Sequence, residues 1–340
     1  MRNDLNNITS LSIDVTYNCN LHCKHCFNSS GEKSYHKSFL DDNQLLDIIS
    51  QVAELPALES VCFCGGEPFL RKEILYKEAD ILKKNNNDLS VNTVTNGMLL
   101  SDDVIDEINS SNLNLIQVSL DGFTPEQHNF IRNNHNSYAK ALNAIKKLCK
   151  TKKKVGVATL PTKINYDDIP KLVNLLNSLG VYIFRMQPLM ILGRAKDNLG
   201  EYVLSPEEYR LLARYLLSAN MDEKIKMRVE WGDPIQHMLS CQNQKSTNIT
   251  INAYGEILVT PYLPIIVGDL KKHSLKEYIE EGLGDVWYSD FLQQKIHTIK
   301  SWDTMDISLD GISPAIFSPE SYNFDICKNK DYFKKGMKYE

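Results

Sequence analysis

The sequence has no long apolar run, no apolar leader and no excess of positive charge. Its longest apolar runs, such as residues 263–267, fall far short of the roughly 20 residues that span a bilayer. Residues 1–10 are polar, which predicts no signal peptide there. The net charge is −5, from 38 Lys and Arg against 43 Asp and Glu, and predicts neither a nucleic-acid nor a membrane partner. We therefore expect a cytoplasmic protein.

The composition instead supplies a large core and eight cysteines. Apolar residues make up 42% of the 340 residues, enough for one large domain or two moderate ones. In a reducing compartment, clustered cysteines serve as metal ligands or catalytic groups more often than as crosslinks. The positions of the cysteines are therefore the first indication of function.

The first half of the chain alternates short β-rich runs with longer amphipathic segments. Strands are predicted at residues 11–15, 60–63, 90–94, 115–120, 155–160 and 181–186. Helices are predicted between them at residues 42–54, 71–85, 102–109, 138–150 and 167–179. Six such repeats indicate a parallel α/β sheet, either doubly wound or curled into a barrel. Both architectures bind ligands at the carboxyl ends of the strands.

This alternation stops after residue 188. Ser205, followed by a proline and two glutamates, predicts the start of a capped helix. Residues 249–259 predict a hairpin that turns at Tyr254-Gly255, and residues 275–281 predict another helix. The second half is therefore expected to be a smaller α+β region.

Three cysteines lie within eight residues directly after the first predicted strand. Cys19, Cys23 and Cys26 have the spacing C-x3-C-x2-C and can surround one compact metal centre. A four-iron cluster normally takes four thiolates, so three would leave one iron open for another ligand. The alternative is a zinc site completed by a nearby histidine, which could be His22, His25 or His36.

A glycine-rich turn follows the second predicted strand. In Gly65-Gly66-Glu67-Pro68, the glycines would let the backbone approach a ligand, the glutamate could receive an ammonium group, and the proline would fix the turn. The alternative is an ordinary connection between a strand and a helix.

Together, the cysteine spacing and the GGEP turn make the chain similar to the radical S-adenosylmethionine (radical SAM) enzymes. The resemblance covers residues 11 to about 190. It implies a partial (β/α)6 TIM-like barrel over residues 1–195. Residues 196–340 resemble a SPASM or twitch extension, which would cap the barrel.

The resemblance also assigns cofactors to residues. Cys19, Cys23 and Cys26 would ligate a 4Fe–4S cluster whose fourth iron binds the amino and carboxylate groups of S-adenosylmethionine. Further contacts to S-adenosylmethionine would come from the GGEP turn and from the ends of the third and fourth strands, at Gly65, Gly66, Glu67, Pro68, Thr95, Asn96, Ser119, Asp121 and Arg132. His25 stands where the family usually has an aromatic residue near the adenine.

The resemblance implies radical chemistry. An electron from an external donor such as flavodoxin or ferredoxin would reduce the cluster. Reductive cleavage of S-adenosylmethionine would then give a 5′-deoxyadenosyl radical that abstracts hydrogen from a C–H bond.

The ligand set of the SPASM-like region is incomplete. Cys241 lies where its first cluster cysteine usually falls, but Val259-Thr260 replaces the expected Pro-Cys, and Cys327 is the only later cysteine. Two cysteines cannot hold a four-iron cluster, so we expect no auxiliary cluster. Cys241 and Cys327 are then candidate hydrogen donors to a substrate radical.

The sequence is consistent with three functions. The SPASM-like region favours maturation of a ribosomally synthesised peptide. The alternative is a small metabolite, such as a sugar, nucleoside or amino acid in a biosynthetic pathway. The third is a non-enzymatic protein that binds zinc or an iron–sulfur cluster.

Overall fold

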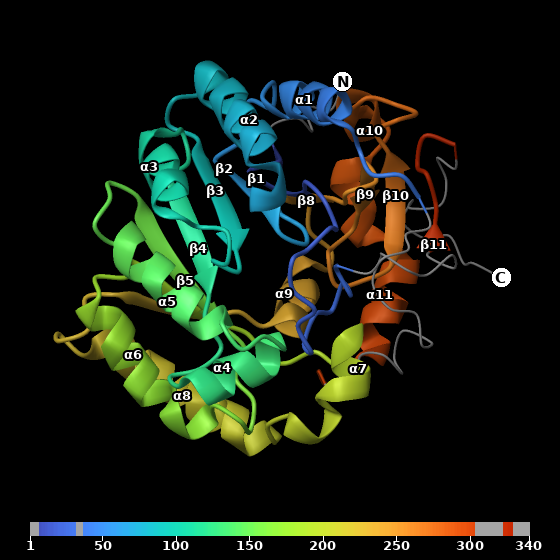
Figure 1. Ribbon diagram of the computed structural model, residues 1–340. Helices are drawn as coiled ribbons and strands as arrows, with labels where there is room; N and C mark the ends of the chain where they lie inside the picture. The colour runs from blue at the N-terminus through green and yellow to red at the C-terminus, as the bar shows by residue number, and fades with distance from the viewer. Residues whose placement is uncertain (1–6, 32–36, 303–321, 329–340) are drawn as a thin grey trace.

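The computed structural model describes residues 7–31, 37–302 and 322–328, and it is built around one eleven-stranded sheet (Figure 1). The strand order is β11-β10-β9-β8-β1-β2-β3-β4-β5-β6-β7. Eight adjacent strands, from β8 through β1 to β7, run parallel to one another. They are β1 (Ser10–Asp14), β2 (Ser60–Cys64), β3 (Ser90–Thr95), β4 (Leu115–Ser119), β5 (Lys154–Thr159), β6 (Ile183–Met186), β7 (Arg228–Trp231) and β8 (Asn248–Ile251). The antiparallel β9 (Glu256–Leu258) and β10 (Ile265–Asp269) and the short β11 (Tyr322–Asn323) complete one edge.

Helices connect the parallel strands and cover the outer face of the sheet (Figure 1). They are α1 (Asp42–Val52), α2 (Lys72–Asn85), α3 (Asp102–Ser110), α4 (Pro125–Arg132), α5 (Ser137–Leu148), α6 (Ile169–Ser178) and α8 (Pro206–Met221). All but α4 present an apolar face to the strands, as Leu45, Ile48, Ile49 and Val52 do in α1. The C-terminal part adds α7 (Arg194–Asn198), α9 (Pro234–Cys241), α10 (Leu275–Glu280) and α11 (Asp290–Thr298).

The expected α/β architecture is confirmed. All six predicted strands and the five helices between them form, with ends that differ by at most two residues from the prediction. The capping box at Ser205 starts α8, and Gly255 turns the predicted hairpin with φ +82°. The sequence reading missed α4, whose eight residues are too few for a clear period. It also missed several elements beyond the region of regular alternation, namely β7, α7, α9, β10, α11 and β11.

The predicted hairpin joins the first half of the chain directly. Strand β8 pairs parallel with β1, with Ile251 opposite Ile13, and β7 pairs with β6. The sheet is thus continuous across the boundary expected near residue 195, and that domain division stays a prediction. None of the described helices is long and apolar enough to cross a bilayer.

The β1–β8 pairing gives a test of whether the hairpin is part of the barrel. Ile251 is fully buried opposite Ile13, so Ile251→Ala should lower the free energy of unfolding by about 2–5 kcal/mol. Leu217→Ala, at a side chain that is 66% exposed, should change it by less than about 0.5 kcal/mol. Urea unfolding followed by circular dichroism measures both. A hairpin that melts in a separate early transition, leaving the main one unchanged, would contradict this packing.

Candidate functional site

A cavity of about 760 Å³ opens at the carboxyl ends of the parallel strands. Residues from β1 and β8 line it, and so do residues from β6 and β7 at the far end of the parallel strands. Because both ends of this series face one space, the sheet is curled into a partial barrel. Of the predicted site residues, those that line the cavity are Cys19, Cys23, Cys26, Gly65, Gly66, Thr95, Asn96, Ser119, Asp121 and Arg132.

The three clustered cysteines share this cavity, and an N–H group donates to each sulfur. The Sγ of Cys19 accepts from the Leu21 amide at 3.5 Å, and the Sγ of Cys26 accepts from the Ser30 amide at 3.4 Å. The Sγ of Cys23, which is 6% exposed, accepts from Arg132 Nη1 at 3.8 Å. Donors of this kind stabilise the negative charge of a thiolate ligand.

Without a bound cation, burial opposes ionisation of these thiols. Burial raises the pKa of Cys19 to about 12, and it also raises the pKa of Cys23. A metal centre would have to supply the positive charge and displace the protons. No three His, Cys, Asp or Glu side chains in the described ranges converge as one ion would require. All three donors are thiols, which are the ligands that iron–sulfur clusters take, so the donor set fits such a cluster.

The alternative zinc ligands do not change this assessment. His22 is exposed and does not line the cavity. His25 turns its Nε2 to Asp121 at 3.1 Å, so that nitrogen is already in use. His36 lies outside the described residues.

Two residues far along the chain hold the cysteine loop. Arg194 reaches three carbonyl oxygens of this loop: its backbone N–H donates to Cys26, its Nε to Cys23 at 2.9 Å and its Nη2 to Ser30 at 2.8 Å. Gly193 allows this approach, because a Cβ there would lie 2.4 Å from the carbonyl oxygen of Phe27, and its φ is +54°. The segment after β6 therefore clamps the loop that follows β1.

The two glycines of the GGEP turn allow close backbone packing, and their expected approach to a ligand stays a prediction. A Cβ on Gly65 would lie 2.2 Å from the carbonyl oxygen of Thr16, and one on Gly66 would lie 2.2 Å from that of Asn18. The Gly66 amide donates to Thr16 O at 2.7 Å, and the Glu67 amide donates to Asn18 O at 2.9 Å. The turn after β2 thus lies directly against the start of the cysteine loop, while both glycines also face the cavity.

The other two residues of this turn are buried behind it. Glu67 accepts from Thr95 Oγ1 and from the Asn96 amide, both at 2.8 Å. Burial raises the pKa of Glu67 to about 7, against the lowering effect of these donors. Pro68 begins a short 3-10 helix that Glu67 caps. The Glu67 carboxylate therefore ties the end of β2 to the end of β3 and does not face the cavity.

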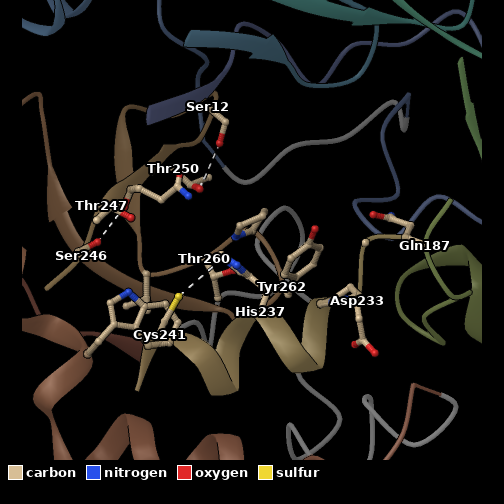
Figure 2. Close-up of a pocket in the computed structure, with 16 residues that line it drawn as sticks. Ser12, Gln187, Asp233, His237, Cys241, Ser246, Thr247, Thr250, Thr260 and Tyr262 are labelled. Carbon is tan, nitrogen blue, oxygen red and sulfur yellow. Dashed lines mark hydrogen bonds between the residues drawn. The ribbon is translucent and has the colours of Figure 1, made fainter. Parts of the chain in front are cut away.

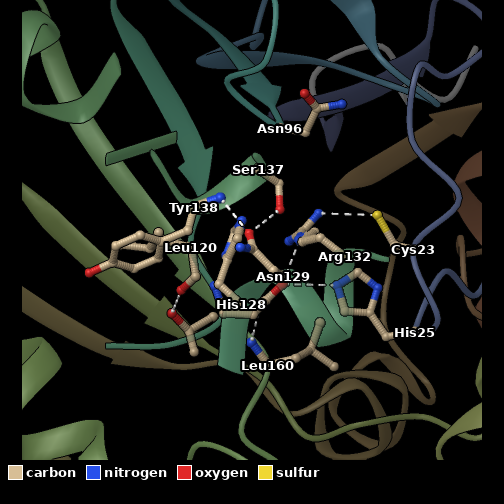
Figure 3. A network of polar contacts seen from close by, with 12 residues as sticks. Cys23, His25, Asn96, Leu120, His128, Asn129, Arg132, Ser137, Tyr138 and Leu160 are labelled. Carbon is tan, nitrogen blue, oxygen red and sulfur yellow. Dashed lines mark hydrogen bonds and ion pairs between the residues drawn. The ribbon is translucent and has the colours of Figure 1, made fainter. Parts of the chain in front are cut away.

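A buried ionic network adjoins Cys23 through Arg132 (Figure 3). Asp121 is fully buried, and its Oδ2 lies 2.6 Å from Arg132 Nε and 3.1 Å from His25 Nε2. Its Oδ1 accepts from the Leu160 amide at 2.9 Å. Burial alone would raise the pKa of Asp121, but Arg132 and His25 outweigh it and hold that pKa well below its usual range. Asp121 therefore orients Arg132 and His25, both of which line the cavity.

The sequence reading missed the polar side chains on the inner face of the barrel. Asp14, Gln117, Arg185 and Glu230 line the cavity, and Arg185 Nε pairs with Glu230 Oε2 at 2.7 Å. Burial raises the pKa of Asp14 to about 7. The signal was present in the strands, because buried parallel strands are usually apolar throughout, whereas here polar residues alternate with apolar ones.

The remaining cysteines have separate surroundings. Cys62 and Cys64 lie on the inner face of β2 with their sulfurs 3.5 Å apart, and Cys64 lines the cavity. Cys241, at the end of α9, lines a smaller chamber beside it. Cys327 packs against the core after β11 and lines neither space.

Comparison with known proteins agrees with these motifs. Residues 13–176 match the family model described as the Radical SAM superfamily. The AdoMet-dependent heme synthase of Methanosarcina barkeri is 23% identical over 291 residues, which are 78% of this chain and 80% of that protein. The sporulation killing factor maturation protein SkfB of Bacillus subtilis is 24% identical over 71% of this chain and 54% of its own length.

Solved structures show the same fold. Streptococcus suis SuiB bound to S-adenosylmethionine superimposes with a TM-score of 0.66 at 16% identity, over 95% of this chain and 78% of that one. The family match over residues 13–176, together with the relatives in sequence, shows that the chain belongs to the radical SAM superfamily of enzymes.

Proposed function

We propose that Cys19, Cys23 and Cys26 ligate the 4Fe–4S cluster that radical SAM enzymes use together with S-adenosylmethionine. When bound, this pair supplies the 5′-deoxyadenosyl radical that abstracts hydrogen from a substrate C–H bond. The observation that carries the proposal is the convergence of three N–H-supported thiols on a cavity at the ends of the strands. A low-potential protein such as flavodoxin or ferredoxin is the proposed electron donor.

The proposed S-adenosylmethionine contacts fall into two groups. Gly65, Gly66 and Ser119 face the cavity and are positioned to contact the cofactor directly. Arg132 is held by Asp121 on one side and Cys23 on the other, so its guanidinium is oriented for a carboxylate. Asp121 is proposed to act through Arg132.

The end of β3 completes this set. Asn96 faces the cavity, and its Nδ2 donates to Asn20 Oδ1 at 2.8 Å. Thr95 also lines the cavity, while Glu67 acts by holding the ends of β2 and β3 together and Pro68 by starting the short helix that Glu67 caps.

The proposed substrate is a ribosomally synthesised peptide. SkfB is by name a maturation protein, and SuiB has been solved bound to its precursor peptide SuiA. The inner face of the barrel offers charges of both signs and neutral hydrogen-bonding groups, which suits a polypeptide. A small metabolite is the second candidate, since the heme synthase matches 78% of this chain.

Cys241 is the proposed hydrogen donor to the substrate radical. It lines a chamber that adjoins the cavity, whereas Cys327 lies away from both spaces. Burial raises the pKa of Cys241, which keeps the thiol protonated and able to give a hydrogen atom. Thr260 lines the same chamber and stands where the SPASM resemblance expects the cysteine of Pro-Cys. Cys241 is therefore the only thiol among the described residues that line the chamber. We accordingly propose that no auxiliary cluster binds there.

Substitution of a cluster cysteine gives the first test. After anaerobic reconstitution the wild type should hold about four irons per chain, and dithionite with S-adenosylmethionine should release 5′-deoxyadenosine. Cys23→Ala should lose most of the iron and release none. Cys149→Ala, outside the cavity, should behave as wild type. One bound zinc per chain would sink the proposal, and about eight irons would contradict the missing auxiliary cluster.

Gly193 gives a second test, which probes the clamp on the cysteine loop. In Gly193→Ala, the Cβ would push against the carbonyl oxygens of Cys26 and Phe27, so iron should be lost to a chelator several-fold faster than from wild type. Gly200→Ala is the matched control, because nothing lies within 4 Å of its Cβ position. Iron loss is followed by visible absorption, and equal rates in the two variants would rule out the clamp.

Asp14 gives a pH-dependent test. Its pKa in the folded protein, about 7, exceeds the value of 3.8 expected in the unfolded chain, so stability should fall as pH rises between these values. Asp14→Asn removes this titration. The free energy of unfolding of Asp14→Asn minus that of the wild type should therefore rise between pH 4 and pH 7. The rise should reach up to a few kcal/mol, at about 1.36 kcal/mol per unit of pKa difference. Asp106→Asn, at an exposed residue, should follow wild type. Parallel curves for Asp14→Asn and wild type would refute the assignment.

A further inference from the structure

A second chamber of about 320 Å³ adjoins the main cavity (Figure 2). Strand β8, the loop between β9 and β10, and helix α9 form its walls. It shares lining residues with the main cavity, namely Ser12, Gln187, Gly232, Thr250, Pro261 and Tyr262. The two spaces therefore lie side by side, with these six residues between them or along both.

One buried polar group in this chamber lacks a partner. Thr260 is 3% exposed, and its Oγ1 has no hydrogen-bond partner among the described residues. By contrast, the hydroxyls of Ser12 and Thr250 bond to each other at 3.2 Å. A buried hydroxyl without a hydrogen-bond partner lowers stability by about 1–3 kcal/mol. Its presence here points to a ligand that supplies the missing hydrogen bond.

The chamber is poorly suited to an anion. No lysine or arginine is found among the described residues that line it. Burial lowers the pKa of His237 and so favours a neutral imidazole. The one carboxylate, Asp233, caps α9 and accepts from two helix amides and from Trp302 Nε1 at 3.1 Å. An anionic group would therefore enter without a compensating charge.

An amide fits the groups that remain. It presents one donor and one acceptor side by side, which match the hydroxyl of Thr260 and the neutral ring of His237. Figure 2 shows His237 and Cys241 on the same side of the chamber, with the Cys241 Sγ 3.9 Å from His237 Nε2. Cys241 can therefore report on what enters.

We propose that the chamber formed by Thr260, His237 and Cys241 binds an uncharged amide of the substrate, while the reacting C–H bond lies in the main cavity. The role of this chamber in turnover rests on the proposed function. The preference of the chamber for a neutral amide over an anion is independent of that function, because it depends only on the groups that line the chamber.

Two alkylating reagents of nearly equal size test this selection. Iodoacetamide carries the amide, and iodoacetate carries a carboxylate on the same reacting carbon. Each is added to the full-length, cluster-loaded protein at one pH, and modification of the Cys241 peptide is timed by mass spectrometry. The rate with iodoacetamide is divided by the rate with iodoacetate. This ratio is then divided by the same ratio measured for the small thiol 2-mercaptoethanol, which corrects for the different intrinsic reactivities of the two reagents.

The corrected ratio should favour iodoacetamide at Cys241 by about tenfold or more, the discrimination that 1.4 kcal/mol provides. Thr260→Val removes the unpartnered hydroxyl and should lower this ratio several-fold, whereas Thr260→Ser should retain it. A wild-type ratio near one, no change in Thr260→Val, or no modification of Cys241 by either reagent would overturn the proposal. If a variant fails to fold, the ratio measured on the wild type alone still tests the proposal. Because the readout is one peptide mass, it is independent of whether the chain cleaves S-adenosylmethionine.

Discussion

The site depends on the close backbone contact between the cysteine loop and its neighbours. The loop after β1 must present three thiols to one cavity, so its backbone has to be held from behind. The turn after β2 approaches it at Gly65 and Gly66, and the segment after β6 approaches it at Gly193. A side chain at any of these positions would collide with a carbonyl oxygen of the loop. These three glycines explain how segments nearly 180 residues apart along the chain form one rigid support.

Charge balance is the second constraint. Arg132 is buried between the Asp121 carboxylate and the Cys23 sulfur, so its positive charge offsets two groups that would otherwise be costly to ionise in the interior. His25 donates to the same carboxylate and remains neutral, because burial and the charge of Arg132 both lower its pKa. One arginine thus fixes a carboxylate and an imidazole, and it supports a thiolate, at the edge of the cavity.

Much of the fold could be predicted because alternation of strands and helices is a local signal. The cysteine spacing and the GGEP turn are also local, and the structure brings both to one cavity. The function of Glu67 could not be read in this way, since its partners Thr95 and Asn96 lie almost 30 residues away. The clamp by Arg194 depends on contacts over more than 160 residues, which no sequence period encodes.

The C-terminal region shows how a lost ligand set can change what a space is able to do. Cys241 and Thr260, two of the positions where the SPASM resemblance would put cluster cysteines, line one chamber that adjoins the main cavity. On the proposal that no cluster binds there, this volume is open to substrate, and no second metal centre can take up electrons from it. Reactions that leave the substrate at the same oxidation level, such as hydrogen exchange, rearrangement or addition of the adenosyl group, are then favoured over multi-electron oxidation. A protonated thiol at Cys241, next to a neutral imidazole, is consistent with the first of these, because it can return a hydrogen atom without separating charge.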